Sequence, residues 1–452
     1  GTNNIVVGAN ALGNEDTGSK NIAIGGNSLE NLNYDGEAYN VAIGHNAGRQ
    51  VTTGIGNTLI GGNAGDALTT GSDNVAVGLA ALGSEDEHGR NVAIGRSALE
   101  SQNAGADAYN VAVGYNAGVL VTTGSSNTLV GGLAGDALTV GDNNIAVGRS
   151  ALSAETQGDR SVAIGNFALR DQNNTSNTDS YNVAVGHAAG ASITTGVQNT
   201  FIGGLAGDAL TTGGQNVGIG YLALTSANGS ENYNVAIGTG SLMNLDGSGD
   251  MWNTAVGTNS GLSLTNGTLN VLIGGRAGDA LTTGSNNVAI GFDALGAEDE
   301  HGGNVAVGYR ALKVQNAGTT AYNVAIGRDA GLSVSTGELN VLIGAFAGDA
   351  LTTGGQNVAV GYEALSSEDA GYFNTAVGFR ALKIQDAGNA YNTAVGYHAG
   401  LQVSTGVSNT ILGGAAADAL TTGSYNVAIG HDALTTEDTG NKSIAIGWRA
   451  LK

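Results

Sequence analysis

The residues that could do chemistry in this chain of 452 residues are mostly carboxylates, and they recur at regular intervals. Two loops carry the same acidic run, at residues 85–87 and 298–300. Paired carboxylates are the groups that glycosidases use as acid and base. Catalysis needs one irregular place where burial perturbs such acids, whereas we expect these repeated polar loops to be solvated. We therefore predict that the segment is not an enzyme, with a polysaccharide-cleaving spike as the weaker alternative.

The histidines supply no competing catalytic motif. They lie at scattered phases of the sequence pattern and form no HExxH motif, no phosphate-binding loop and no Ser–His pairing of the triad type. They are His45, His88, His187, His301, His398 and His431.

One aspartate occupies a fixed place in each stretch of about 70 residues. The surrounding string, GGNAGDAL at residues 61–68, resembles the glycine-rich nonapeptide that binds calcium in parallel β-rolls. Calcium rolls share each ion between adjacent turns, whereas here Ala64 replaces a glycine and the string recurs only once in four turns. We expect these carboxylates to accept hydrogen bonds from turn N–H groups, with calcium as the alternative and no other cofactor. The six are Asp66, Asp136, Asp208, Asp279, Asp349 and Asp418.

A row of aromatic residues recurs at the same interval. Each ring could stack on a sugar and so form a carbohydrate platform, or it could cover the end of the loop that precedes it. The residues are Tyr39, Tyr109, Tyr181, Trp252, Tyr322 and Tyr391.

All of these residues are positioned by one repeated pentad, NVAIG at residues 40–44. We count twenty-six copies, most often 17 residues apart and otherwise 18, 19 or 21. The first residue is Asn in twenty-four copies and Ser in two, and the fifth is Gly in all. The apolar residues between them predict a short strand that ends at a glycine turn. A fixed period near 20 predicts an all-β fold, a β-solenoid of about 26 coils. The structural residues that we single out are Asn40, Gly44, Asn110, Gly114, Asn182 and Gly186.

The coils come in four forms that succeed one another in a super-repeat of about 70 residues. Super-repeats begin near residues 4, 74, 144, 216, 287, 357 and 426, so we predict one continuous solenoid region over residues 1–452. Positions in a coil are numbered below from the first residue of its pentad. Insertions fall almost entirely in the second form, which places the longer loops on one edge of the stack. In the fourth form the middle strand residue is larger: Leu59, Leu129, Phe201, Leu272, Leu342 or Ile411.

Both faces of each predicted strand are apolar, because the residue between the two Val or Ile residues is usually Ala. We expect Val and Ile to fill the interior of the coil and the Ala column to face another chain. The larger fourth-form residues would then be knobs at that interface, and the sequence predicts a homo-oligomer. We expect the Asn column to form a hydrogen-bonded ladder along the axis.

Composition excludes several classes of protein. A net charge of -22 repels polyphosphate, so nucleic acid and anionic membranes are poor partners. The absence of Pro and Cys excludes collagen and a disulfide scaffold. No run of about 18 apolar residues is present, so we expect no membrane insertion by this segment. No polar caps or leader are visible, and we expect the chain to be part of a longer polypeptide that carries them.

The pentads at residues 161–165 and 443–447 read SVAIG and SIAIG. They resemble the head repeat of trimeric autotransporter adhesins, and the strings NVAIG, NTLIG and TTG are similar to repeats in phage tail fibres. The resemblance implies a left-handed parallel β-roll with three protomers side by side, located outside a cell, on its surface or on a virion. The coils here, at 17 to 21 residues, are longer than those of the adhesin heads. A single-chain, three-sided β-helix is the alternative architecture.

From these patterns we expect a non-enzymatic extracellular fibre, a trimeric rod for surface or host attachment. The alternative is a carbohydrate- or receptor-binding module that uses the aromatic row and the outer loops.

Overall fold

The computed structural model describes residues 1–452, which form strands, turns and loops. It contains no helix, and so none that is long and apolar enough to cross a lipid bilayer. The residues form two compact units, Gly1–Asn232 and Tyr233–Lys452.

Each coil contributes one three-residue strand, which spans positions two to four of its pentad. The strands of the first unit are β1 (Ile5–Val7), β2 (Ile22–Ile24), β3 (Val41–Ile43), β4 (Thr58–Ile60), β5 (Val75–Val77), β6 (Val92–Ile94), β7 (Val111–Val113), β8 (Thr128–Val130), β9 (Ile145–Val147), β10 (Val162–Ile164), β11 (Val183–Val185), β12 (Thr200–Ile202) and β13 (Val217–Ile219), with the two-residue strand β14 (Glu231–Asn232). Those of the second unit are β15 (Val235–Ile237), β17 (Thr254–Val256), β18 (Val271–Ile273), β19 (Val288–Ile290), β20 (Val305–Val307), β21 (Val324–Ile326), β22 (Val341–Ile343), β23 (Val358–Val360), β24 (Thr375–Val377), β25 (Thr393–Val395), β26 (Thr410–Leu412), β27 (Val427–Ile429) and β28 (Ile444–Ile446), with the two-residue strand β16 (Gly249–Asp250).

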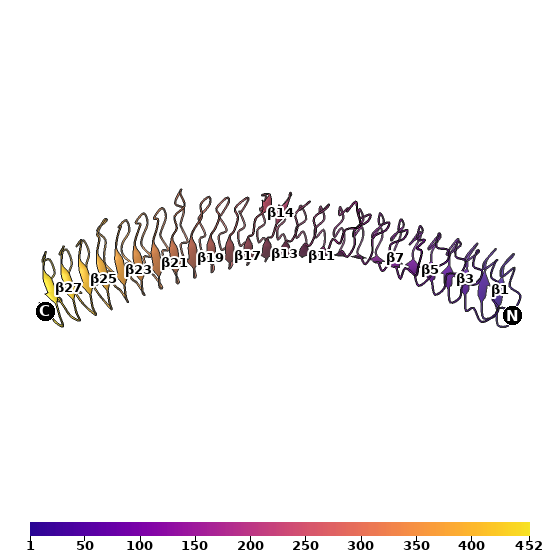
Figure 1. Ribbon diagram of the computed structural model, residues 1–452, viewed down its shortest axis with the longest axis horizontal. Helices are drawn as coiled ribbons and strands as arrows, with labels where there is room; N and C mark the ends of the chain where they lie inside the picture. Colours follow the sequence, from indigo (N-terminus) through magenta and orange to yellow (C-terminus); the bar gives the residue numbers. More distant parts are fainter. The chain divides into compact units, whose positions relative to one another are not determined.

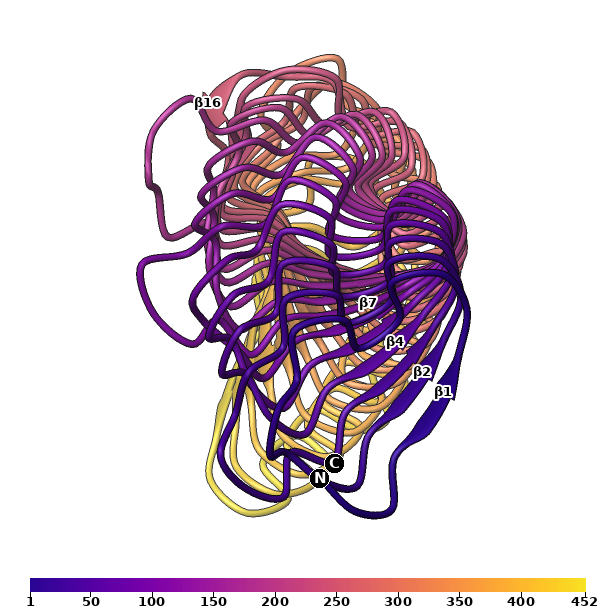
Figure 2. The same cartoon turned by 90° about the vertical axis from the view of Figure 1, so that its right-hand side faces the viewer.

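Within each unit, every three-residue strand pairs in parallel and in register with the strand of the next coil. Val41 in β3, for example, lies opposite Thr58 in β4, and Ala42 lies opposite Leu59. Figure 1 shows the strands in chain order along the coils. In the coils of the first unit, β1, β2, β4 and β7 lie on one side and the longer loops project from the other (Figure 2). The predicted parallel β-solenoid is therefore confirmed.

The glycine at position five is required by this stacking. Gly114 has a φ of 150°. A Cβ atom on Gly114 would lie 2.3 Å from the carbonyl oxygen of Gly131 in the next coil. The backbone conformation and the contact both exclude a side chain.

The orientation predicted for the strands is wrong. Ala42, the middle residue of β3, is fully buried inside the coil, whereas Val41 and Ile43 on either side of it are only partly buried. The same pattern recurs along both units, so the Ala column lines the interior and the Val and Ile residues form the outer face. The physical reason is that the interior is thin: positions three and nine share it, and a small residue at one leaves room for Leu at the other, as in Ala76 and Leu82.

The larger fourth-form residues are also in the core and are not knobs at an interface between chains. Leu59 is fully buried and fills the space left by glycine at position nine. A Cβ on Gly48 or Gly65 would lie 2.5 Å or 2.8 Å from a methyl carbon of Leu59. The residues that this corrects are Leu59, Leu129, Phe201, Leu272, Leu342 and Ile411, all with an exposed fraction of 0%.

The largest of these residues is compensated by the smallest neighbour. Phe201 in β12 lies opposite Gly218 in β13, whereas Leu129 in β8 lies opposite Ala146 in β9. A Cβ on Gly218 would lie 2.8 Å from Cδ1 of Phe201. Glycine at this position therefore makes room for the phenylalanine ring.

We predict that Gly218→Ala destabilises the solenoid by about 1–3 kcal/mol, because it overpacks the core beside Phe201. Adding Phe201→Leu should recover most of that loss, since the pair then matches Leu129 and Ala146. Chemical unfolding of both single variants and the double variant measures the coupling. Simple addition of the two single costs would contradict this account of the core.

Candidate functional site

A buried column of asparagines links each coil to the next. Oδ1 of Asn110 accepts a hydrogen bond from the backbone N–H of Asn127 at 2.8 Å. Nδ2 of Asn110 donates to the carbonyl oxygen of Gly124 in its own coil at 2.7 Å. Asn40 and Asn182 make the same two bonds. Each of these three side chains thus satisfies a buried donor of the following coil and an acceptor of its own turn. Nδ2 of Asn91, Asn304 and Asn374 has no partner.

We predict that Asn127→Ala costs about 2 kcal/mol or more, because it leaves the N–H of Asn144 and the carbonyl of Gly141 buried without a partner. Asn127→Ser should cost less, since Ser161 occupies the same column. Denaturant unfolding measures both, and the exposed Asn103→Ala is the control, with an expected change within about 0.5 kcal/mol. Equal effects of Asn127→Ala and Asn103→Ala would show that the ladder does not hold the coils.

We expected the acidic loops to be solvated, but they are partly buried. Glu85 and Glu298, which open the two acidic runs, are fully buried. Each lies at position twelve of its coil, and this position faces the core. In four successive coils the residues at position twelve are Glu85, Gln102, Val121 and Leu138, all with an exposed fraction of 0%. Of the acids that follow, Asp86 and Asp299 are partly buried, and Glu87 and Glu300 are exposed.

The buried carboxylates differ in how well they are satisfied. Oε1 of Glu155 accepts the N–H of Gly158 at 2.7 Å, and Oε2 accepts Nε2 of Gln172 at 2.9 Å and Nδ2 of Asn174 at 3.1 Å. Oε1 of Glu85 accepts the N–H of His88 at 3.3 Å, while its Oε2 has no partner. Burial raises the pKa of the Glu85 carboxyl to about 7. Burial likewise raises the pKa values of Glu298 and, to about 7, of Glu368.

These shifts predict a solenoid that is more stable in mild acid than at neutral pH. A folded-state pKa raised from 4.5 to about 7 means that the stability contributed by protonated Glu368 is complete below about pH 4.5 and is lost as the pH rises through 7. Glu368→Gln should therefore flatten the dependence of the unfolding midpoint on pH between 5 and 8. Glu87→Gln removes one exposed charge and is the control. An unchanged slope in Glu368→Gln would contradict burial of this carboxyl.

Carboxylate and imidazole groups gather in three clusters that could hold a metal ion: Glu85, Asp86 and His88; Glu298, Asp299 and His301; and Glu368, Asp369 and Asp386. None of them contains a member of the Asp column.

Burial raises the pKa of Asp66 and, to about 6, that of Asp349. The partners of the column vary, because Asp208 accepts the hydroxyl of Thr225 at 2.6 Å, whereas Oδ1 of Asp349 has none.

The predicted aromatic row is exposed, with exposed fractions between 49% for Tyr181 and 60% for Tyr322. Each ring contacts the preceding coil or the loop before it. The Nζ atom of Lys20 lies over the ring of Tyr39 at 4.9 Å, and the hydroxyl of Tyr39 donates to Glu37 at the end of the loop. Trp252 stacks on Tyr233 at 4.0 Å. The rings are thus both accessible at their edges and attached to the loop ends.

A second aromatic row, at position six, was missed by our sequence reasoning. Tyr362, Phe379 and Tyr397 stack on successive coils, with ring centroids 5.3 Å and 5.5 Å apart. Beside them, a hollow of about 270 Å³ is lined by Phe346, Asp349, Tyr362, Glu363, Ser366 and Lys383. The signal was the frequent aromatic residue directly after the invariant glycine.

Comparison of the chain with models of protein families and with curated proteins finds no match.

Proposed function

We propose that this chain is part of a non-enzymatic extracellular fibre, in which three copies associate side by side through the outer faces of their strands. The fibre would belong to a cell surface or a virion and would serve attachment. The repetitive β-solenoid, which is compatible with a structural role, supports this proposal.

The observation that carries the proposal is the apolar outer face. The first and last residues of each strand, at positions two and four of the coil, are Val, Ile, Leu or Thr, and they are partly exposed along both units. Ile94 and Ile164 each have an exposed fraction of 38%. Soluble monomers rarely expose contiguous apolar patches larger than a few hundred Å², and larger ones mark interaction sites. A matching face on an identical chain would cover this surface along its full length.

Regular repetition favours a structural role over catalysis. Coils of one form carry the same residues at the same positions, so each chemical group appears several times along the chain. Such an array adds length coil by coil, and it multiplies weak contacts into avidity.

The proposal predicts three chains per particle in native mass measurements. Replacing Ile94 and Ile164 by Asp should shift the mass toward one chain, because the charge cannot be buried at the interface. Thr123→Asp, in an exposed turn, should leave the mass unchanged, and circular dichroism should show that every variant is folded. A wild-type chain that is monomeric at all concentrations would contradict the proposal.

A second candidate is recognition of carbohydrate by the aromatic row, favoured by the half-exposed Tyr109 and Trp252. Binding on a glycan array that disappears when both residues are changed to Ala would support it. An unaltered profile would count against it.

A further inference from the structure

Two coils carry the same turn three super-repeats apart. The string Glu-Asp-Glu-His-Gly follows β5 at residues 85–89 and β19 at residues 298–302. In each turn one carboxylate oxygen of the Glu, one of the first Asp, and one imidazole nitrogen lie within 4.8 Å of one another. No other coil combines these three residue types at these positions.

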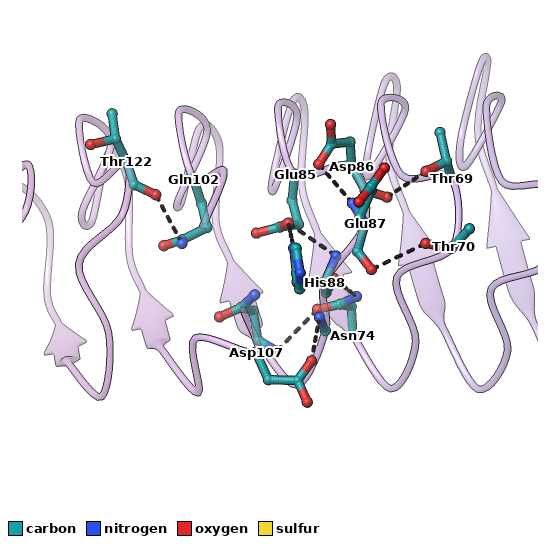
Figure 3. Close-up of polar contacts among 12 residues, drawn as sticks. Thr69, Thr70, Asn74, Glu85, Asp86, Glu87, His88, Gln102, Asp107 and Thr122 are labelled. Carbon is teal, nitrogen blue, oxygen red and sulfur yellow. Dashed lines mark hydrogen bonds and ion pairs between the residues drawn. The ribbon is translucent and has the colours of Figure 1, made fainter. Parts of the chain in front are cut away.

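In each turn the Glu side chain is buried and has too few hydrogen-bond donors for its two carboxylate oxygens. The side chain of Glu85 is fully buried and lies toward the imidazole, with 3.9 Å between its Oε1 and Nδ1 of His88 (Figure 3). Oε2 of Glu85 and Nδ1 of His88 are both buried and have no hydrogen-bond partner. The same atoms of Glu298 and His301 lack partners, and the corresponding distance there is 3.7 Å. Each carboxylate accepts one N–H bond through Oε1, and its unpartnered Oε2 would be stabilised by a proton or a cation.

The equivalent Glu in another super-repeat shows the alternative solution. Glu155 is also fully buried, but its carboxylate accepts hydrogen bonds from Gly158, Gln172 and Asn174. That turn has no histidine. Glu368 also lacks partners at both carboxylate oxygens, but its turn has no histidine either. What distinguishes the two histidine turns is therefore an imidazole beside the unsatisfied carboxylate.

The backbone of each turn is held in place by the preceding coil. The hydroxyls of Thr69 and Thr70 donate to the carbonyls of Asp86 and Glu87 at 2.9 Å and 3.2 Å, as Figure 3 shows. In the second turn, the hydroxyls of Thr282 and Thr283 donate to the carbonyls of Asp299 and Glu300 at 2.8 Å and 3.3 Å. These bonds position the ligands before an ion arrives.

Solvent reaches the second turn through a hollow of about 460 Å³. Its lining includes His301, Glu300, Ser285 and Tyr322. The hollow brings solvent to the side chain of His301, while Nδ1 of that imidazole and the Glu298 carboxylate lie buried behind it.

We propose that each turn binds one divalent transition-metal ion through the Glu carboxylate, the Asp carboxylate and Nδ1 of the His: Glu85, Asp86 and His88 in one site, and Glu298, Asp299 and His301 in the other. Imidazole with carboxylates suits zinc and similar ions, whereas calcium and magnesium prefer oxygen ligands alone. Tetrahedral zinc bonds of about 2.0–2.2 Å place ligand atoms about 3.3–3.6 Å apart, so atoms that now lie up to 4.8 Å apart would approach by at most about 1.5 Å. The all-carboxylate cluster of Glu368, Asp369 and Asp386 is not part of the proposal, because two of its members are exposed.

Calorimetric titration of the full chain with zinc chloride, after treatment with a chelator, tests this proposal. We expect two sites per chain and a higher thermal unfolding midpoint with zinc bound. His88→Gln and His301→Gln should each leave one site, and the double variant should leave none. The matched control, His45→Gln with His187→Gln, changes two exposed histidines of other turns and should keep both sites.

Circular dichroism establishes that each variant is folded, so a lost site reports on its ligands. Absence of binding would overturn the proposal. Zinc binding that the double variant retains would also overturn it, since it would reveal an adventitious ion only.

Discussion

The stack depends on a buried hydrogen bond that recurs along both units. The backbone N–H at position one lies inside the solenoid, where water does not reach it, and the side chain of the preceding Asn accepts it, as Asn110 does for Asn127. The same side chain closes its own turn through Nδ2. Because such an Asn forms hydrogen bonds in its own coil and in the next, it holds neighbouring coils in register, and their strands pair in register as a result. Coil length can vary only where the chain leaves this register, in the loops.

The second constraint is the volume of a thin interior. Positions three, nine and twelve share it, so a large residue at one requires a small residue at another. Ala76 with Leu82 and Leu59 with Gly65 are two solutions to the same volume, and Phe201 with Gly218 extends the exchange to adjacent coils. The four forms of coil are four ways to fill one cross-section. Polar residues at position twelve, such as Glu85 and Gln102, occupy the same interior and bring carboxyl groups with raised pKa values into the core.

Sequence alone was sufficient for the coil count, the strands, the glycine turn and the parallel solenoid, because these follow from a strict period. It was insufficient for the direction of the strand faces, since Ala and Val are both apolar and a period of two does not tell inside from outside. The signal that indicates the inward face is the pairing of the large Phe201 with Gly218, since glycine at that place makes room in a closed interior.

Burial of Glu85 was missed because acids in loops are usually solvated. Only the alignment of Glu85 with Gln102, Val121 and Leu138 reveals an inward-facing position. Clusters such as Glu85 with His88 depend on side-chain geometry that spacing does not give.

Because the strand faces are reversed, the surface that we propose for association is formed by Val and Ile and not by Ala. A continuous row of partly exposed Val and Ile residues lies where a small Ala surface was expected, and it is better suited to lateral association of identical chains.

The central claim, that buried asparagines hold the coils in register, is tested most directly by amide hydrogen exchange. The N–H groups of Asn127 and Asn144 should exchange among the slowest in the chain, with protection close to that of global unfolding. Exchange as fast as that of the exposed loop residues Gly105 and Ala106 would contradict the account.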